Sequence, residues 1–319
     1  MPEHCGYVLA DQVEVGVLVD IAEFNFEVGG LVGGIWGPRR DYDFARLVEA
    51  MDDDWPAVLV LCEGAFYEHN GSAGAFGAAT AMREAGGRPY VPLLGTLTGD
   101  RGPMAPVVFV DPQVITVHNW YSGREPDHFS HRTNLMVASL AGSSEKWRLV
   151  AAHWDVNDEL ARLRDARNLR PYARPDVPCA VVGDFNSHPS GPHWRVDNFD
   201  AAPAWRRYTK THWPPEFRED GTPVDERATD ALDFLLGRWH EPTGARRGGA
   251  GFHCAAEHFK DYTPTVNGGT PGTFGPMTLD RVLVNDGFKD GLTGYRVHLP
   301  QDPENPPSDH RRITVTLDI

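Results

Sequence analysis

Short apolar segments with a β-strand pattern alternate along the chain with segments whose apolar residues recur at helical spacing. The strand-like segments are rich in Val, Ile and Leu and end at turn-forming residues. They are residues 13–26, 57–62, 107–110, 114–117, 134–141, 147–153, 179–183 and 278–284. Helical spacing appears in residues 41–51, 72–83, the segment after 157, and 226–239. The pattern therefore predicts a fold that mixes strands and helices.

The helix expected after residue 157 carries both a start signal and an apolar side. Asn157 is a suitable N-cap, because its side chain can accept a hydrogen bond from a backbone N–H of the first turn. Leu160, Leu163 and Leu169 follow on one side, with mixed charge on the other. The sequence predicts that this leucine side faces a core.

Residues 187–262 differ from the rest of the chain, since they contain many prolines and four of the tryptophans: Trp194, Trp205, Trp213 and Trp239. The regular pattern resumes at residue 278. We therefore predict one domain over residues 1–319 with an insertion at about 187–262, a length that large sandwich folds reach as single units. The aromatic residues either line a substrate pocket or build a small secondary core, and packing is the commoner use of buried aromatics.

The composition is that of a globular protein, with 41% hydrophobic and 24% charged residues. The net charge of -15 gives the whole surface no attraction for nucleic acids or anionic membranes, although local basic patches remain compatible with it. Paired arginines usually lie at solvated surface. The pairs are Arg39-Arg40, Arg206-Arg207, Arg246-Arg247 and Arg311-Arg312.

The cysteines and apolar runs bear on location. Cys5, Cys62, Cys179 and Cys254 are widely spaced, as expected for free thiols in a reducing compartment. Residues 1–20 lack the basic start and long apolar run of a secretory signal, and the longest apolar run is too short to cross a bilayer. We expect a cytoplasmic protein without membrane insertion.

Oxygen-bearing residues at predicted strand ends form a candidate metal site. Glu63 directly follows a buried apolar run. Asn25 and Glu27 lie near the end of the first strand, and alternation puts both on one face. Hard cations such as Mg²⁺ prefer carboxylate and amide oxygens. With Asp309, these residues are the predicted ligands of Mg²⁺ or Mn²⁺.

The other candidates suit proton transfer and phosphate contact. Asp184 and Asn186 share one side of an extended segment, where Asp184 can orient or deprotonate a water and Asn186 can donate to a phosphate oxygen. His310 can hold or protonate a phosphoryl group, and Asp280 can fix the tautomer of that imidazole. His153 adds a second imidazole. These five residues are the predicted catalytic set.

The order of these segments resembles that of the endonuclease/exonuclease/phosphatase superfamily, the DNase I-like group. Each residue alone is a weak signal, because an Asp after a Gly is usually only a turn residue. The matching segments are Phe24-Asn25-Phe26-Glu27, Leu61-Cys62-Glu63, Val150-Ala151-Ala152-His153, Val182-Gly183-Asp184-Phe185-Asn186, Leu279-Asp280-Arg281-Val282 and Ser308-Asp309-His310. They span most of the chain, and the fourth and sixth are the most specific.

The resemblance implies an α+β fold, a four-layer α/β/β/α sandwich in which two mixed sheets are flanked by helices. It implies a metal-dependent phosphoester hydrolase whose site lies at one end of the sheets, with Mg²⁺ or Mn²⁺ beside Asn25, Glu63 and Asp309. His153 is similar to the DNase I, sphingomyelinase and phosphatase branches rather than to AP endonucleases. Cys62, where a Gln often precedes the Glu, and the long insertion depart from the family pattern.

Three functions stay open at this point. The first is a phosphodiesterase or nuclease-like enzyme, the second a small-molecule phosphomonoesterase of the same fold, and the third a non-catalytic binding protein. A nuclease needs a basic groove and shows steep salt dependence, whereas a small-molecule enzyme needs an enclosed pocket. The complete set of polar positions argues against the binding protein. The natural substrate, the number of metal ions and the oligomeric state are left undetermined.

Overall fold

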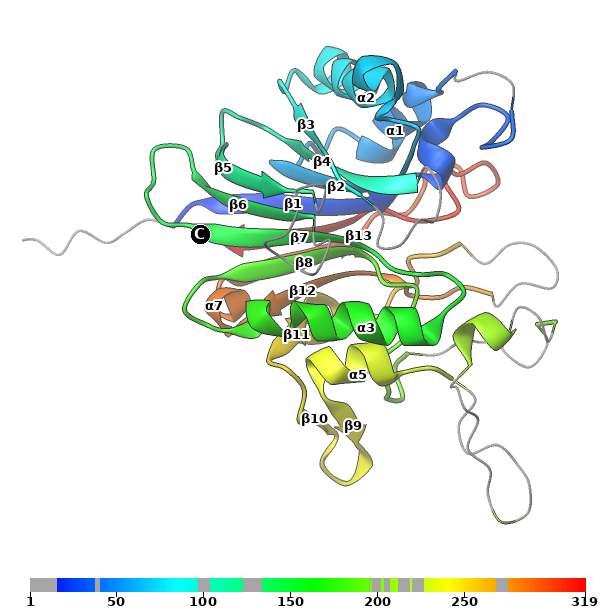
Figure 1. Ribbon diagram of the computed structural model, residues 1–319, viewed down its shortest axis with the longest axis vertical. Helices are drawn as coiled ribbons and strands as arrows, with labels where there is room; N and C mark the ends of the chain where they lie inside the picture. The colour runs from blue at the N-terminus through cyan, green and yellow to red at the C-terminus, as the bar shows by residue number, and fades with distance from the viewer. Residues whose placement is uncertain are drawn as a thin grey trace, which may run out of the picture.

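The computed structural model describes residues 16–37, 41–96, 104–122, 134–194, 196, 202–203, 207–211, 219, 227–267 and 275–319. Two six-stranded sheets stack face to face, with helices on the outer face of each (Figure 1). The helices are α1 (Phe44–Met51), α2 (His69–Gly86), α3 (Glu159–Leu169), α5 (Asp230–Leu236), α6 (Ala255–Phe259) and α7 (Asp286–Lys289). This architecture confirms the predicted four-layer sandwich.

The first sheet has the strand order β13-β14-β1-β2-β4-β3. Its strands are β1 (Leu18–Asn25), β2 (Val58–Ala65), β3 (Val91–Leu94), β4 (Met104–Val110), β13 (Leu292–Val297) and β14 (Ile313–Asp318). β1 runs parallel to β2, so both strands finish at the same end of the sheet, on the right in Figure 1. The pairing places Asn25 opposite Cys62, one residue before Glu63.

The second sheet has the order β11-β12-β8-β7-β6-β5. Its strands are β5 (Ile115–Tyr121), β6 (Leu135–Leu140), β7 (Trp147–His153), β8 (Cys179–Asp184), β11 (Phe252–Cys254) and β12 (Asp280–Asn285). Parallel pairing sets His153 opposite Asp184, and antiparallel pairing sets Asp280 opposite Asp184. The register therefore brings these three residues to one level of the sheet.

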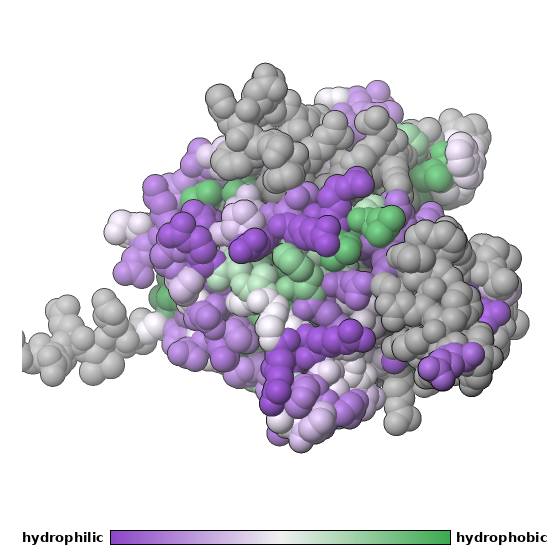
Figure 2. Space-filling view, turned by 60° about the horizontal axis from the view of Figure 1, so that its bottom comes forward, coloured by the Kyte–Doolittle hydropathy of each residue, from purple (hydrophilic) through white to green (hydrophobic). Residues whose placement is uncertain are grey.

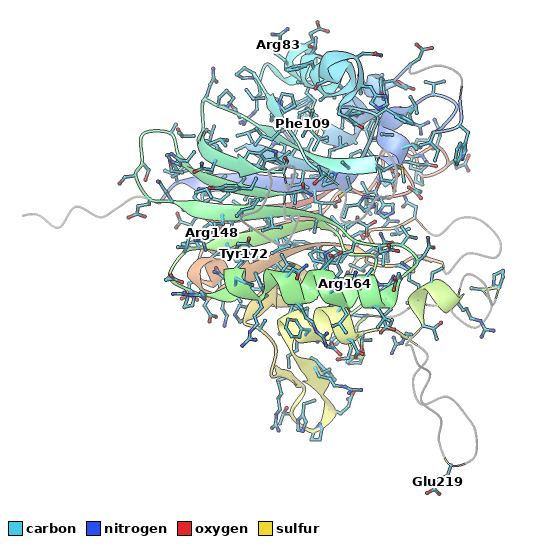
Figure 3. The ribbon with its side chains drawn as sticks, viewed as in Figure 1. Arg83, Phe109, Arg148, Arg164, Tyr172 and Glu219 are labelled. Carbon is cyan, nitrogen blue, oxygen red and sulfur yellow. The ribbon has the colours of Figure 1, made fainter. Side chains whose placement is uncertain are left out.

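Three apolar layers hold the sandwich together. The layer between the sheets includes Ile21, Val60, Leu149, Val182 and Val282. A second layer joins the first sheet to α1 and α2, and a third joins the second sheet to α3 and α5. Burying a large aliphatic side chain contributes about 1.5–3 kcal/mol. Phe109 on β4 belongs to the second layer, whereas Arg83 on α2 and Arg164 on α3 lie on the outside (Figure 3).

Strand alternation explains where the polar residues lie. Asn25 is four residues beyond Ile21, and Asp184 is two beyond Val182, so each shares the face that packs between the sheets. Asp280 stands in the same relation to Val282. The apolar layer between the sheets thus gives way, at one end, to carboxylates and amides.

The start of α3 corrects the prediction for its cap. The N-cap is Asp158, whose Oδ1 accepts a hydrogen bond from the backbone N–H of Ala161 at 3.1 Å. Asn157 instead donates its backbone N–H to a neighbouring loop carboxylate. Leu160 is 51% exposed, and Arg162 is buried in its place. The prediction that Leu160 faces a core is therefore wrong, because the buried side of the helix is partly polar.

The described part of the predicted insertion contains α5, the hairpin of β9 (Arg238–His240) and β10 (Ala245–Arg247), β11 and α6. β11 pairs with β12, so this stretch supplies the edge strand of the second sheet. Trp194 is buried in the apolar layer beside α3 and α5. That tryptophan therefore builds core, whereas Trp205 and Trp213 lie outside the described residues. One domain with an insertion stays a prediction.

Two of the paired arginines are not at solvated surface. The Arg312 side chain is 1% exposed and donates to the backbone oxygens of Met51 and Asp54. Arg246 is 12% exposed and forms a salt bridge with Glu257. The expectation of solvated arginines is wrong at these positions, because carbonyl and carboxylate oxygens satisfy the buried guanidinium groups.

The outer surface agrees with the composition. Seen from the side of α3, α5 and the β9–β10 hairpin, the described surface is mostly hydrophilic, with a smaller apolar area near the centre of the view (Figure 2). Cys62, Cys179 and Cys254 are buried free thiols, and Cys5 lies outside the described residues. Among the described residues, no helix has the length and apolar character needed to span a membrane.

Candidate active site

The two sheets meet through a direct contact between Asn25 and Asp184. The Asn25 amide donates from Nδ2 to Asp184 Oδ2 at 3.1 Å and to Glu63 Oε1 at 3.2 Å. Asn25 and Asp184 are 159 positions apart in the chain, and both are buried. The parallel pairs β1–β2 and β7–β8 thus bring three predicted site residues into one hydrogen-bonded group.

Glu63 reaches this group because β2 is irregular. The register of β2 against β4 shifts between Leu61 and Gly64, and Glu63 has a left-handed φ of 63°. Leu61 packs on the helix side, so an unbroken strand would point Glu63 to that side as well. In the bulged strand the carboxylate instead accepts a hydrogen bond from the Val28 backbone N–H at 2.8 Å.

Ser308 ties the end of β1 to the segment before β14. Its hydroxyl donates to the Asn25 backbone oxygen at 2.7 Å and accepts from the backbone N–H groups of Glu27 and His310. Burial, and then the neighbouring carboxylates of Asp309 and Glu63, raise the pKa of Glu27. Glu27 and Asp309 therefore lie close to the group formed by Asn25.

The oxygen atoms at this end fit a hard divalent cation. Asn25 Oδ1 is buried and, within the described part of the chain, accepts no hydrogen bond. Burial first, and then the carboxylates of Asp309 and Glu63, raise the pKa of Glu27, and a cation bound among these carboxylates would stabilise their charged forms. All of these donors are oxygens, the type that Mg²⁺ and Mn²⁺ prefer.

A second group of donors stands beside the first. One ligand atom from each of Asp184, Asp280 and His310 can be chosen so that all three lie within 4.8 Å of one another. This spacing would suit a cation too. The same atoms also suit proton transfer, and their distances fit both cation binding and proton transfer.

Asp184 is held by three hydrogen bonds. Its Oδ1 accepts from the backbone N–H of Asn186 at 2.8 Å, and Oδ2 accepts from the amide groups of Asn25 and Asn186. Burial by itself raises the pKa of Asp184, but the charges of His310 and His153 outweigh it, and the pKa is lowered. A carboxylate can accept about four hydrogen bonds, so the ionised Asp184 keeps acceptor capacity for a water.

The Asn186 amide contacts Asp184 and the backbone of the neighbouring strand end. Its Nδ2 donates to Asp184 Oδ2 and to the Trp154 backbone oxygen, each at 3.2 Å. An amide nitrogen has two donor hydrogens, and these contacts use both. The geometry therefore supports the positioning of Asp184 by Asn186. Donation to a phosphate oxygen stays a prediction that requires one of these contacts to be exchanged.

His310 and Asp280 form a buried pair. His310 Nδ1 lies 2.8 Å from Asp280 Oδ2 and 3.0 Å from Oδ1. Burial opposes the charged imidazole, but the carboxylates of Asp280, Asp184 and Asp309 raise the pKa of His310 well above its usual value. His310 is therefore protonated near neutral pH, with its Nε2–H available for a substrate.

His153 lies beside the group with one ring nitrogen in use. Its Nδ1 is 3.2 Å from the Met104 backbone oxygen, which requires the hydrogen on Nδ1. Nε2 has no hydrogen-bond partner among the described residues. The ring also borders a pocket whose lining includes Asn134, Asp165 and Asn168. With Nδ1 bonded to the Met104 oxygen, Nε2 is the ring nitrogen left to contact a bound group.

Sequence reasoning missed three residues of this region. Ser308 was part of the matched motif but had no assigned task. Glu23 shares the face of Asn25 and is fully buried; burial, and then the Asp280 and Asp184 carboxylates, raise its pKa well above the usual value. Alternation along β1 could have pointed to it. Lys210 comes from the insertion, where no sequence pattern marks it.

Comparison with known proteins gives matches in structure only. No family model and no curated protein matches the sequence. An AP endonuclease from Archaeoglobus fulgidus superposes with a TM-score of 0.55 at 12% identity, covering 94% of this chain and 100% of that one. The 3′ phosphatase NExo from Neisseria, bound to a product DNA hairpin, gives 0.54 at 15% identity, covering 94% and 100%. An endonuclease/exonuclease/phosphatase family protein from Bacteroides thetaiotaomicron gives 0.51 at 14%, covering 95% and 98%.

At these identities the similarity establishes the fold. The chain has the DNase I-like fold of the endonuclease/exonuclease/phosphatase superfamily, as the order of its motifs indicated.

Proposed function

We propose that this protein is a metal-dependent phosphoester hydrolase, and in the first place a phosphodiesterase or nuclease-like enzyme. The observation that carries the proposal is the Asn25–Asp184 contact, which joins the metal-binding candidates of the first sheet to the proton-transfer candidates of the second. A protein that only bound a phosphoester would not need a buried carboxylate and a buried imidazole–carboxylate pair beside the cation ligands.

Asn25, Glu27, Glu63 and Asp309 are the residues that would hold Mg²⁺ or Mn²⁺. When bound, the cation supplies Lewis-acid polarisation of a phosphoryl oxygen. Asn25 Oδ1, which accepts no hydrogen bond from the described residues, and the neighbouring carboxylates of Glu27, Glu63 and Asp309 support this assignment.

Asp184 would align the attacking water and accept its proton. Its lowered pKa keeps it ionised, and its three hydrogen bonds restrict the orientation of the carboxylate. Fixing the water relative to phosphorus removes much of the entropic cost of an in-line attack.

His310 would bind the phosphoryl group or donate a proton to it. The imidazolium is held by Asp280 through Nδ1, which leaves Nε2–H as the donor. His153 would contact the substrate on the side of Asp184 that lies away from Asp280. The β7–β8 register pairs His153 with Asp184, and His153 Nε2 has no hydrogen-bond partner among the described residues.

Structural neighbours lend support from the same fold. Two of the three compared above are named as an AP endonuclease and as a 3′ phosphatase bound to product DNA. We extend to this chain only the reaction class, hydrolysis of a phosphoester, and treat nucleic acid as one candidate substrate.

The proposal is tested by an activity screen with the full chain. Plasmid DNA, RNA, bis(4-nitrophenyl) phosphate and 4-nitrophenyl phosphate are incubated with Mg²⁺ or Mn²⁺, with EDTA controls. We expect cleavage of at least one diester that EDTA abolishes and added metal restores. Absence of turnover on all of them, or turnover indifferent to EDTA, would contradict the proposal.

The same screen separates the substrate classes. A nuclease should lose affinity steeply between about 50 and 200 mM salt, because bound nucleic acid releases counterions. A small-molecule phosphomonoesterase should favour 4-nitrophenyl phosphate and respond weakly to salt.

A further inference from the structure

The predicted insertion sends one charged side chain to the centre of the site. Lys210 belongs to the short helical turn η3 (Tyr208–Lys210) and is only 7% exposed. Its Nζ donates to the Asn186 backbone oxygen at 2.9 Å and to Asn186 Oδ1 at 3.0 Å. Both acceptor oxygens belong to Asn186, whose amide nitrogen in turn donates to Asp184.

This interaction, together with the two acceptor oxygens on the other side of the amide, decides which way the Asn186 amide points. Because Oδ1 faces the ammonium, Nδ2 must face the oxygens of Asp184 and Trp154. The reversed amide would set an NH₂ group against an ammonium and Oδ1 against two acceptor oxygens. Leaving a buried donor or acceptor unsatisfied costs about 1–3 kcal/mol, so a single orientation is strongly favoured.

The turn that carries Lys210 is held in place from two sides. Arg162 on α3 donates from Nη2 to the Thr209 backbone oxygen at 2.9 Å. The backbone N–H of Ala228 donates to the Lys210 oxygen at 2.8 Å, and Thr211 forms a β-bridge with Arg227. The ammonium therefore approaches Asn186 from a braced segment.

Keeping an ammonium here has a cost that packing alone does not explain. An ion removed from water is unfavourable unless it is paired and hydrogen-bonded. Burial, and then the charge of Arg162, lower the pKa of Lys210 to about 7, while Asp184 opposes the shift. A Met side chain would occupy similar space without this cost. The position thus favours a group that donates hydrogen bonds.

We propose that Lys210 is a positioning residue, which fixes the Asn186 amide and through it the carboxylate of Asp184. The inference rests on the proposed hydrolase function and gives the insertion a definite part in it. Lys210 touches neither substrate nor cation in this scheme and acts only through Asn186.

The test is a double-mutant cycle on a phosphodiester. Lys210→Met, Asn186→Ala and the double variant are assayed with bis(4-nitrophenyl) phosphate at saturating metal. Lys146→Met, an exposed lysine in the β6–β7 turn, is the matched control. Removing a residue that orients a functional side chain without contacting the substrate typically lowers activity about 10–100-fold. We expect that decrease in kcat for Lys210→Met, with KM changed less than about threefold.

The double-mutant cycle also shows whether Lys210 changes the rate through Asn186. If Lys210 acts through Asn186, Lys210→Met should change the rate by less than about twofold in the Asn186→Ala background, because coupled residues are non-additive. Lys210→Ala should regain activity with ethylammonium and not with tetramethylammonium, which has no N–H donor. A purely structural role would show neither behaviour.

Each result separates this inference from the hydrolase assignment. Additive losses of rate, no discrimination between the two amines, or a wild-type rate in Lys210→Met would overturn the positioning role while Asp184→Asn stays inactive. An inactive wild-type protein would overturn both. If Lys210→Met does not fold, the amine comparison on Lys210→Ala and the cycle with Lys210→Gln decide the question.

Discussion

Replacing Asp184 by Asn tests the central carboxylate with the smallest change of shape. Asp184 is 2% exposed and accepts hydrogen bonds from Asn25 Nδ2, the Asn186 backbone N–H and Asn186 Nδ2. The substitution keeps one carbonyl oxygen as an acceptor. It replaces the other oxygen by an NH₂ group and removes the negative charge.

The structure lets the stability change be bounded. A hydrogen bond to a charged group contributes about 1.5–3 kcal/mol, and the amide would lose one or two of the three at Asp184. The carboxylate of Asp280 no longer faces a like charge, but the attraction between Asp184 and the two histidines is lost as well. We therefore expect the lost hydrogen bonds to destabilise the protein by about 1.5–6 kcal/mol and to lower its unfolding temperature without preventing folding at 25 °C.

The folded variant should also lose most of its activity. An asparagine cannot take the proton of the attacking water, and general-base catalysis typically contributes about 10²–10⁴-fold. This corresponds to about 2.7–5.5 kcal/mol in the activation barrier. In the wild type, the charges of His310 and His153 lower the pKa of Asp184 and keep the carboxylate ionised, and the amide has no charge for them to stabilise.

The assay measures kcat/KM on bis(4-nitrophenyl) phosphate together with circular dichroism and thermal unfolding. Asp176→Asn, an exposed carboxylate away from the site, is the control and should behave as wild type. A folded Asp184→Asn protein with a rate within about threefold of wild type would refute the role given to Asp184. A variant that fails to fold would refute the stability estimate instead.

Other predictions follow from neighbouring features. Glu63→Gln should abolish the rise in unfolding temperature that Mg²⁺ produces in the wild type, because a cation stabilises only the protein that binds it; an undiminished rise would remove Glu63 from the ligands. Burial, and then the Arg312 guanidinium, lower the pKa of His298 to about 3, so stability should fall as the pH drops from about 6.5 towards 3, by up to ~1.4 kcal/mol per pH unit. Urea unfolding across this range should show a weaker dependence of stability on pH for His298→Gln, and an equal dependence would contradict the neutral buried histidine. Gly183→Ala should destabilise by ~3 kcal/mol or more, since φ is 152° and a Cβ would lie 1.8 Å from the Ala152 oxygen; a wild-type unfolding midpoint would show that the strands can separate there.

Local sequence was sufficient to predict most of the strands and the polar residues at their ends. A run of apolar residues predicts a strand such as β8, and the same pattern puts the polar residue Asp184 at the end of that strand. The order of such strand ends along the chain indicated the family fold, which the two stacked sheets confirmed. These features depend on neighbours in sequence, so they can be predicted without the fold.

The helix ends and the buried charges could not be predicted in this way. Asn157 and Asp158 are both good cap residues, and only the path of the preceding loop selects Asp158. Arg162 and Arg312 look like surface arginines in sequence, but carbonyl groups from distant segments take up their donors. The partners of a buried charge are supplied by tertiary structure.

The candidate active site also combines features that local sequence predicts with features that depend on tertiary structure. The sequence by itself determined which side chains stand at strand ends and that oxygens and imidazoles predominate there. Only the tertiary structure decided that a bulge turns Glu63 towards Asn25, that Asn186 supports Asp184, and that Lys210 reaches Asn186 from the insertion. The physical reason is that alternation and apolar runs are local properties of the chain, whereas hydrogen bonds between residues as far apart as Asn25 and Asp184 exist only after both sheets have packed.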